Sequence, residues 1–156
     1  CPCGYLGDTS GKCSCTPDQV ARYRARISGP LMDRIDLQLF VPRVERASLT
    51  AAPDVNAETS SAVRARVMAA HARQLARQGK PNARLTPKEI EKHCALDAAS
   101  KQLLDAAMTR LALSARAYHR VLKVARTIAD LASVEQIGSA QIAEAVRYRE
   151  LDRGAV

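Results

Sequence analysis

Apolar residues recur with helical spacing over most of the chain after residue 57. Positions three and four residues apart are apolar in this region, which is the pattern of α-helices with one buried face. One such face comprises Tyr118, Leu122, Ala125 and Ala129. Helices of this length are not stable alone in water, so we expect them to pack on one another as a bundle.

Capping residues predict the boundaries of these helices. Ser, Thr and Asp accept hydrogen bonds from first-turn N–H groups, Pro is tolerated at the first helical position, and Gly often follows the last one. An early helix should run from Thr16 to about Ile27. The later helices are expected over residues 58–78, 86–93 and 97–112, and after caps at Ser114 and Ser139, the last with Ile142, Ala145 and Val146 facing inward.

The first 56 residues follow another pattern. Residues 1–15 are rich in Gly, Cys and Ser and predict an irregular loop, whereas residues 36–41 alternate polar and apolar side chains and predict one short strand. We therefore expect a mainly α chain. It should have a mostly irregular segment over residues 1–45, a linker over 46–56 and a helical domain over 57–153.

Composition favours helices and an anionic partner. Apolar residues make up 47% of the chain but aromatic residues only 3%, and the abundant Ala suits closely packed helices. With 24 basic and 16 acidic side chains the net charge is +8, which favours nucleic acid or nucleotide, although ordinary solubility also accounts for it. No apolar run reaches the roughly 20 residues that span a membrane, so we expect a cytoplasmic protein without a membrane partner.

Basic residues gather between Thr59 and Lys88, a stretch that contains no carboxylate. Lys and Arg side chains bind the phosphates of a nucleic-acid backbone without reading its sequence. The residues that we expect to contact DNA are Arg64, Arg73, Arg77 and Lys80.

Four of the five cysteines lie near the start of the chain, at positions Cys1, Cys3, Cys13 and Cys15. Four thiolates suit a tetrahedral Zn²⁺ ion, and the Gly-rich loop between them is able to fold around one. The spacing differs from the usual C-x2-C pairs, so reduced cysteines in a disordered end and disulfides stay open as alternatives. The fifth, Cys94, is expected to be a small buried apolar residue.

Three stretches resemble a known family. They are residues 1–8 (CPCGYLGD), 27–37 (ISGPLMDRIDL) and 114–131 (SARAYHRVLKVARTIADL). Together they resemble the ComM/YifB proteins, in the magnesium-chelatase-like branch of AAA+ ATPases, and the resemblance covers nearly the whole chain. It implies that residues 57–153 are the helical lid of an AAA+ module and that residues 1–45 are a truncated piece of its α/β core.

Arg34 matches the arginine finger that this family carries in a Gly-Pro-Leu-Leu-Asp-Arg segment at the subunit boundary. A guanidinium ion is planar and permanently charged, and it stabilises the negative charge that spreads over a transferring phosphoryl group. The resemblance therefore implies that Arg34 acts in trans. The alternative is a structural pair with Asp33 or Asp36 on a turn.

Arg116 matches the sensor-2 arginine, which contacts the γ-phosphate from the start of a lid helix. A helix N-terminus favours anions, so a cation in the first turn is locally unfavourable and requires another reason. The resemblance implies that Arg116 contacts ATP bound by its own subunit. The cations further along, Arg120, Lys123 and Arg126, are expected to form a solvated or subunit-facing stripe.

The sequence contains no G-x-x-x-x-G-K-[ST] phosphate loop and no apolar strand ending in paired carboxylates. In the family these motifs precede the Cys-Pro-Cys segment, so we expect the C-terminal part of a longer ATPase that uses ATP and Mg²⁺. By itself the chain should be monomeric and inactive.

The resemblance implies that the whole protein is a hexameric, ATP-driven helicase or branch-migration enzyme that acts on DNA in natural transformation. Two other functions stay open. One is an ATPase subunit of a magnesium chelatase that inserts Mg²⁺ into a porphyrin, and the other is a stand-alone zinc and DNA-binding module.

Overall fold

A computed structural model describes residues 1–8, 10–39, 41, 44, 50 and 56–149. These residues form helices and contain no β-strand, only an isolated parallel bridge between Leu96 and Ile137, so the expectation of a mainly α chain is confirmed. The helices are α1 (Pro17–Arg24), α2 (Gly29–Met32), α4 (Ser60–Gln78), η1 (Asn82–Arg84), α5 (Pro87–His93), α6 (Ala98–Arg110), α7 (Ala115–Leu131) and α8 (Ser139–Arg147).

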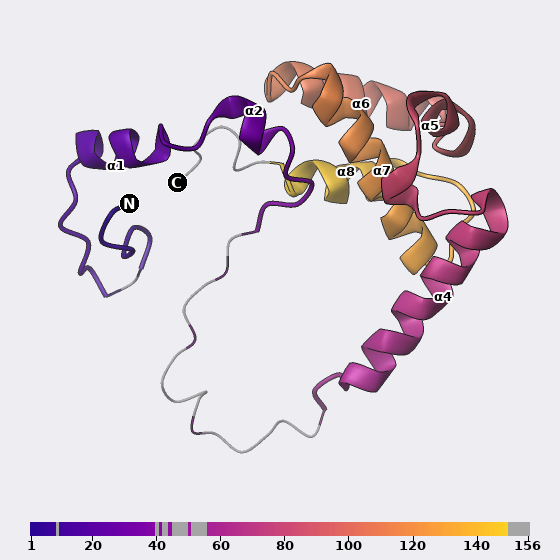
Figure 1. Cartoon of the computed structure of the whole chain (residues 1–156), viewed down its shortest axis with the longest axis horizontal. Helices are drawn as coiled ribbons and strands as arrows, with labels where there is room; N and C mark the ends of the chain where they lie inside the picture. Colours follow the sequence, from indigo (N-terminus) through magenta and orange to yellow (C-terminus); the bar gives the residue numbers. More distant parts are fainter. Residues whose placement is uncertain (9, 40, 42–43, 45–49, 51–55, 150–156) are drawn as a thin grey trace.

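Helix α7 is the centre of a helical bundle. It packs against α4, α5 and α8, and α8 also packs against α6 (Figure 1). Ala117, Ala125 and Ala129 of α7 are fully buried, and such small side chains allow neighbouring helices to approach closely. The rest of the core includes Leu104, Val121, Ile137 and Ile142.

Most predicted helix starts are confirmed, because a cap is a local interaction. The predicted caps Thr16, Asp97 and Ser114 each accept from a first-turn N–H, and Gly79 ends α4 with a left-handed φ of 70°. Helix α4 begins at Ser60 rather than at residue 58, because Thr59 is its cap and accepts from the N–H of Ala62 (3.3 Å). The predicted cap at Ser139 is wrong by one residue. Gly138 is the cap, and its N–H donates to the Gln141 side chain (3.0 Å).

Two predicted helix ends are wrong by a few residues. Helix α1 ends at Arg24 rather than Ile27, and it contains no buried residue that would extend it by packing. Helix α6 ends at Arg110 because Ala112, with a φ of 41°, has a left-handed backbone that leaves the helix.

The predicted strand over residues 36–41 is wrong for the described residues 36–39 and 41, while residue 40 lies outside them. A strand needs a neighbouring strand to bond its alternating N–H and C=O groups. Here the N–H of Gln38 donates instead to the carbonyl of Tyr148 (2.9 Å), at the end of α8. This segment therefore crosses the bundle as an irregular chain.

The linker over 46–56 falls largely outside the described residues, as do residues 150–153, so the domain division stays a prediction. In the described part of the chain, no helix is both long and apolar enough to cross a membrane.

Candidate functional site

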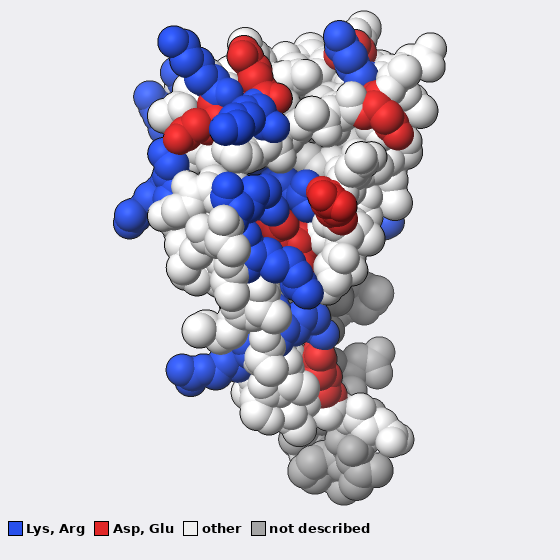
Figure 2. All heavy atoms as spheres, turned by 90° about the vertical axis from the view of Figure 1, so that its right-hand side faces the viewer, with Lys and Arg blue, Asp and Glu red and all other residues white. Residues whose placement is uncertain are grey.

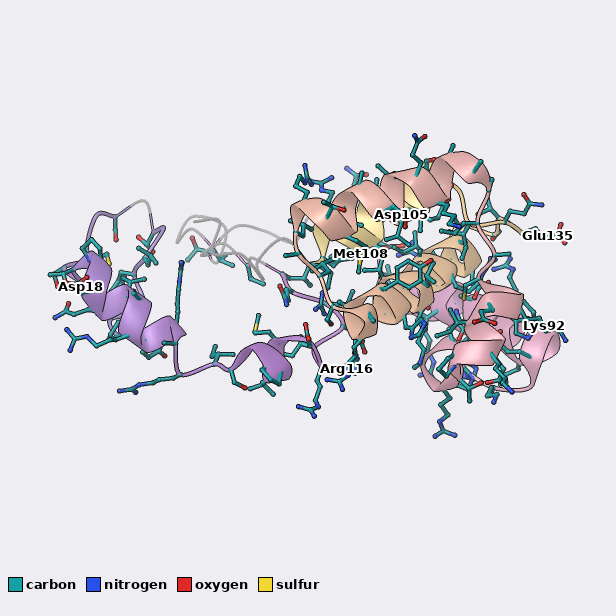
Figure 3. All side chains as sticks on the ribbon, turned by 90° about the horizontal axis from the view of Figure 1, so that it is seen from above. Asp18, Lys92, Asp105, Met108, Arg116 and Glu135 are labelled. Carbon is teal, nitrogen blue, oxygen red and sulfur yellow. The ribbon has the colours of Figure 1, made fainter. Side chains whose placement is uncertain are left out.

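The C-terminal end of α2 lies against the N-terminal end of α7. The hydroxyl of Ser114 donates to Asp33 Oδ2 (2.9 Å) and also caps α7 by accepting from the N–H of Ala117 (3.2 Å). Because Arg34 follows Asp33 directly and Arg116 lies in the first turn of α7, this contact brings the two predicted nucleotide-contacting segments together. Figure 3 places Arg116 at this end of the helix, beside the short α2.

Two arginines of the bundle hold the same segment. Arg149, with only 1% of its surface exposed, donates to the carbonyl of Ile35 and lies 3.7 Å from Asp33. Arg120 of α7 forms an ion pair with Asp36. The carboxylates of Asp33 and Asp36, on either side of Arg34 and Ile35, are therefore both in contact with side chains of the bundle.

Arg34 itself is exposed and donates one hydrogen bond, to the carbonyl of Pro30 (3.2 Å). Among the described residues it forms no ion pair, so the alternative of a structural pair with Asp33 or Asp36 does not describe this arrangement. Arg116 is exposed too, and it bonds to none of the described side chains. Both guanidinium groups are therefore accessible to an anion.

A groove with a volume of about 630 Å³ runs beside Arg116. One side carries Arg116, Arg120 and Lys123 of α7, and the apolar walls include Leu37, Leu85 and Ile90. Asp36 and Glu144 line the groove as well, and Arg120 is paired with Asp36, so the groove carries charges of both signs.

The prediction of a solvated stripe on α7 is wrong for Arg126. Its side chain is 4% exposed and donates to the carbonyls of Glu135 (2.6 Å) and Val134 (2.9 Å). Arg126 therefore fixes the turn that follows α7. Lys123 donates to the carbonyl of Ala83 (3.0 Å), so it ties α7 to η1.

The predicted DNA-contacting residues have different environments. Arg77 makes a two-pronged ion pair with the buried Asp130 (2.6 and 2.9 Å), and Arg73 donates to the carbonyl of Asp130 (2.9 Å). Lys80 pairs with Glu89 (2.6 Å), whereas Arg64 is exposed and has no ion pair within the described part of the chain. Figure 2 shows Lys and Arg side chains running along this face of the molecule.

Asp130 is the centre of a polar network that the sequence did not reveal. Asn82, which is buried, also donates to its carboxylate (2.8 Å). Burial by itself would raise the pKa of Asp130, but the hydrogen bonds from Arg77 and Asn82 outweigh it and hold the pKa below its usual value. Arg77 and Asn82 lie about 50 residues from Asp130 in sequence, so no local pattern signals their contacts, whereas the pair with Arg126 (3.2 Å) lies within α7.

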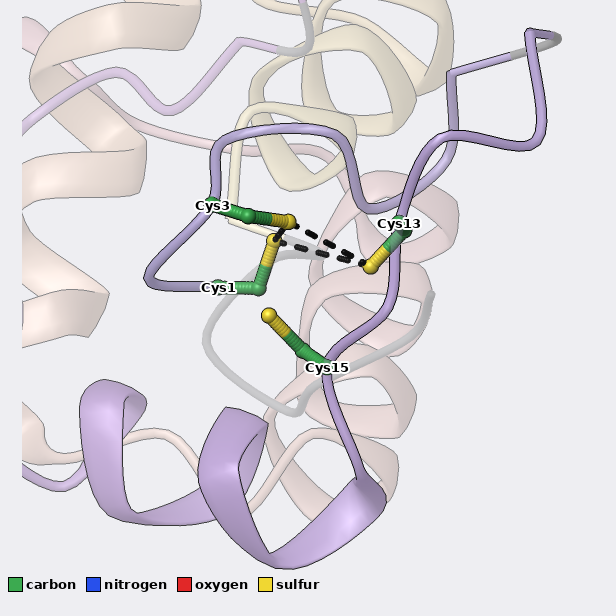
Figure 4. Close-up of side chains that lie close together, drawn as sticks. All are labelled: Cys1, Cys3, Cys13 and Cys15. Carbon is green, nitrogen blue, oxygen red and sulfur yellow. Dashed lines mark hydrogen bonds between the residues drawn. The ribbon is translucent and has the colours of Figure 1, made fainter.

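The four N-terminal cysteines come together in space (Figure 4). Their Sγ atoms all lie within 4.8 Å of one another, and none of the four is in a disulfide. A backbone hydrogen bond at Tyr5, followed by contact with Cys15, lowers the pKa of Cys3 to about 7. Cys94 is buried, as predicted, and burial raises its pKa to about 11.

Two protein families match this chain. The magnesium chelatase subunit ChlI C-terminal family matches residues 57–149, and the magnesium chelatase subunit ChlI family matches residues 1–49. The first match alone covers more than half of the chain. The chain belongs to the magnesium-chelatase-like family of AAA+ proteins.

Relatives within the magnesium-chelatase-like family are similar over most of the chain. The uncharacterized protein YifB of Salmonella typhimurium is 46% identical over 89% of this chain and 27% of its own length. Competence protein ComM of Haemophilus influenzae is 44% identical over 97% of this chain and 29% of its own length. An uncharacterized protein of Mycobacterium tuberculosis is 32% identical over 96% of this chain. The chain thus spans less than a third of the length of these relatives.

Proposed function

We propose that this chain is the C-terminal part of a hexameric AAA+ ATPase that uses ATP and Mg²⁺ to act on DNA. In this proposal Arg34 completes the site of a neighbouring subunit, and Arg116 contacts the nucleotide of its own. The observation that carries the proposal is the Asp33–Ser114 contact, which joins two segments whose arginines are both exposed. A free guanidinium is what a developing phosphoryl charge requires.

The test uses the full-length protein with single alanine substitutions. Arg34→Ala should leave ATP binding nearly unchanged and slow hydrolysis by about 10³-fold or more, because the charge it meets grows only in the transition state. Arg116→Ala should weaken ATP binding as well. The matched control is Arg110→Ala, an exposed arginine at the end of α6. Loss of binding, rather than turnover, in Arg34→Ala would contradict the assignment.

Mixed rings test whether Arg34 acts in trans. Arg34→Ala protein mixed with a phosphate-loop variant should regain part of the ATPase activity, since some interfaces then combine an intact finger with an intact phosphate loop. Absence of recovery in rings that mass measurement shows to be mixed would overturn the trans role.

The DNA part of the proposal is supported by the net positive charge and by a relative named for competence. Arg64 is the most informative of the predicted contacts, because Arg73 and Arg77 also hold the fold together. Arg64→Glu should weaken DNA binding without sequence preference and reduce the slope of log affinity against log salt by roughly 1. An unchanged affinity of Arg64→Glu for DNA would mean that DNA binds at another surface.

A second candidate function follows from the descriptions of both matching families, which name magnesium chelatase. In that case the full-length ATPase would be stimulated by a porphyrin and its chelatase partner rather than by DNA. Measuring ATP hydrolysis with DNA and, separately, with a porphyrin and the chelatase partner distinguishes the two candidate functions.

A further inference from the structure

The N-terminal part of the chain has no apolar core. None of the described residues among 1–37 is buried, and every residue of α1 except the half-buried Val20 is exposed. A segment of this size without a core usually needs a disulfide or a metal ion to hold one conformation, and an isolated eight-residue helix is unstable in water. Some other interaction must therefore fix residues 1–16.

The four thiols have the geometry of a tetrahedral metal site. A Zn–S bond is about 2.3 Å long, so four thiolates around one Zn²⁺ stand about 3.8 Å apart. The Sγ of Cys1 lies 3.5 Å from that of Cys3 and 3.9 Å from that of Cys13, and Cys3 and Cys13 are 3.6 Å apart. Cys15 completes the cluster.

The backbone around the thiols also favours a metal. The N–H of Leu6 points at Cys1 Sγ (3.2 Å), and such hydrogen bonds stabilise thiolate ligands. Gly4, Gly7 and Gly11 have left-handed φ values of 80°, 81° and 65°, which let the loop fold back on itself so that both cysteine pairs meet.

We infer that Cys1, Cys3, Cys13 and Cys15 bind one Zn²⁺ ion, which acts as the core of residues 1–16 and anchors the start of α1. Cys15 immediately precedes the cap of α1, Thr16, whose side chain accepts from the N–H of Gln19 (3.3 Å). The metal thus fixes the point from which the helix starts. Binding replaces the thiol protons by the metal and involves no change of oxidation state.

Two other uses of the cysteines fit less well. A disulfide would join the thiols in pairs, whereas here all four converge on one point between them (Figure 4). An iron–sulfur cluster would hold its cysteines further apart, since several iron and sulfide ions lie between the thiolates. The arrangement therefore fits a single metal ion with four sulfur ligands in tetrahedral geometry, and Zn²⁺ is the usual ion in such sites.

The experiment measures the metal content of the whole chain, purified under reducing conditions without added metal. One zinc per chain is expected by elemental analysis. The double variant Cys13→Ser, Cys15→Ser should contain none, and the control Ser14→Ala, inside the same loop, should contain one. Absence of zinc from the unmodified chain, iron in its place, or zinc retained in the double variant would each overturn the inference.

The structural role is tested by hydrogen exchange before and after chelation. Removing the metal should speed exchange over residues 1–25 and leave α6, α7 and α8 protected, because the bundle has its own core. Re-addition of Zn²⁺ should restore the slow exchange. Unchanged exchange over residues 1–25 would overturn the role as a core. Neither measurement depends on ATP hydrolysis, so the inference and the proposed function fail separately.

Discussion

Arg77 and Asp130 form the ion pair on which the packing of α4 against α7 depends. Asp130 is only 1% exposed and accepts hydrogen bonds from Arg77 and Asn82. A buried carboxylate with these partners cannot be removed without leaving charged and polar groups unsatisfied.

Asp130→Asn should lower the free energy of unfolding by about 3 kcal/mol, at the low end of the range for breaking buried pairs because Arg77 is partly solvated. Urea denaturation followed by circular dichroism measures it. The control is Glu58→Gln, which removes the exposed pair with Arg66 and should cost less than about 1 kcal/mol. Equal losses in the two variants would contradict the structural role of Asp130.

Acid should destabilise the protein through the same residue. Because the pKa of Asp130 is lower in the folded protein than in the unfolded chain, its contribution is complete above about pH 4 and is lost as the pH falls further. The Asp130→Asn variant should therefore lose less stability than the parent between pH 5 and pH 2, as measured by Tm. If Tm fell equally with pH in the two proteins, Asp130 would not be the source of the acid sensitivity.

Thiol reactivity should separate the N-terminal cysteines from Cys94. In protein from which metal has been chelated, iodoacetamide near pH 7.5 should modify the released Cys3 well before Cys94, whose pKa burial raises to about 11. Mass spectrometry of tryptic peptides measures the order. Earlier labelling of Cys94 would mean that the core around it opens readily.

At the scale of elements, sequence reasoning succeeded where the signal is local. Helix starts at Asp97 and Ser114 were predicted because a cap involves residues three apart. The strand over 36–41 was predicted wrongly because alternation does not say whether a partner strand exists. Arg126 was misplaced because its burial depends on the turn after α7, where it donates to the carbonyls of Glu135 and Val134, although its pair with Asp130 lies on the same helix.

The same limit applies to the candidate site. Arg34 and Arg116 were identified through the family resemblance, but nothing in the sequence indicated that Asp33 would meet Ser114, 81 residues later. The convergence of the four cysteines was one of the alternatives that the sequence left open, and it required the structure.

The contact between α2 and α7 should depend on Asp33. Asp33→Asn should speed hydrogen exchange over residues 29–36 by roughly tenfold, which corresponds to a loss of about 1.4 kcal/mol locally, and leave the α7 core protected. Asp105→Asn, an exposed carboxyl on α6, is the matched control. Unchanged exchange in Asp33→Asn would show that Arg149 and Arg120 hold the segment without it.

At the scale of the whole molecule, the two ends of the chain differ in how they are stabilised. The bundle buries a continuous core, whereas apolar residues before it are about half exposed or more, for example Ile27, Leu31, Leu37 and Val41. In the proposed AAA+ protein these side chains would pack against the rest of the ATPase core.

Limited trypsin digestion should reflect this difference. Cleavage after Arg22, Arg24 and Arg26 should precede any cleavage within residues 98–147, because proteolysis requires local unfolding and the bundle opens least readily. Time-resolved mass spectrometry should show a persistent fragment that contains α4 to α8. Early cleavage inside α7 would contradict the bundle as the stable unit.

Helix α4 has one further consequence, which is mechanical. Its buried residues, Ala70 and Gln74, lie in its second half, and the first half extends from the bundle as a lever (Figure 1). The stretch from Ser60 to Ala70 is about 15 Å long, so a tilt of α4 by about 10° would move Ser60 by about 3 Å. The packed half of α4 is held to α7 by the ion pair between Arg77 of α4 and Asp130 of α7. Helix α7 also carries Arg116. A shift of α7 that α4 follows would therefore be larger at Ser60 than at the contact between the two helices.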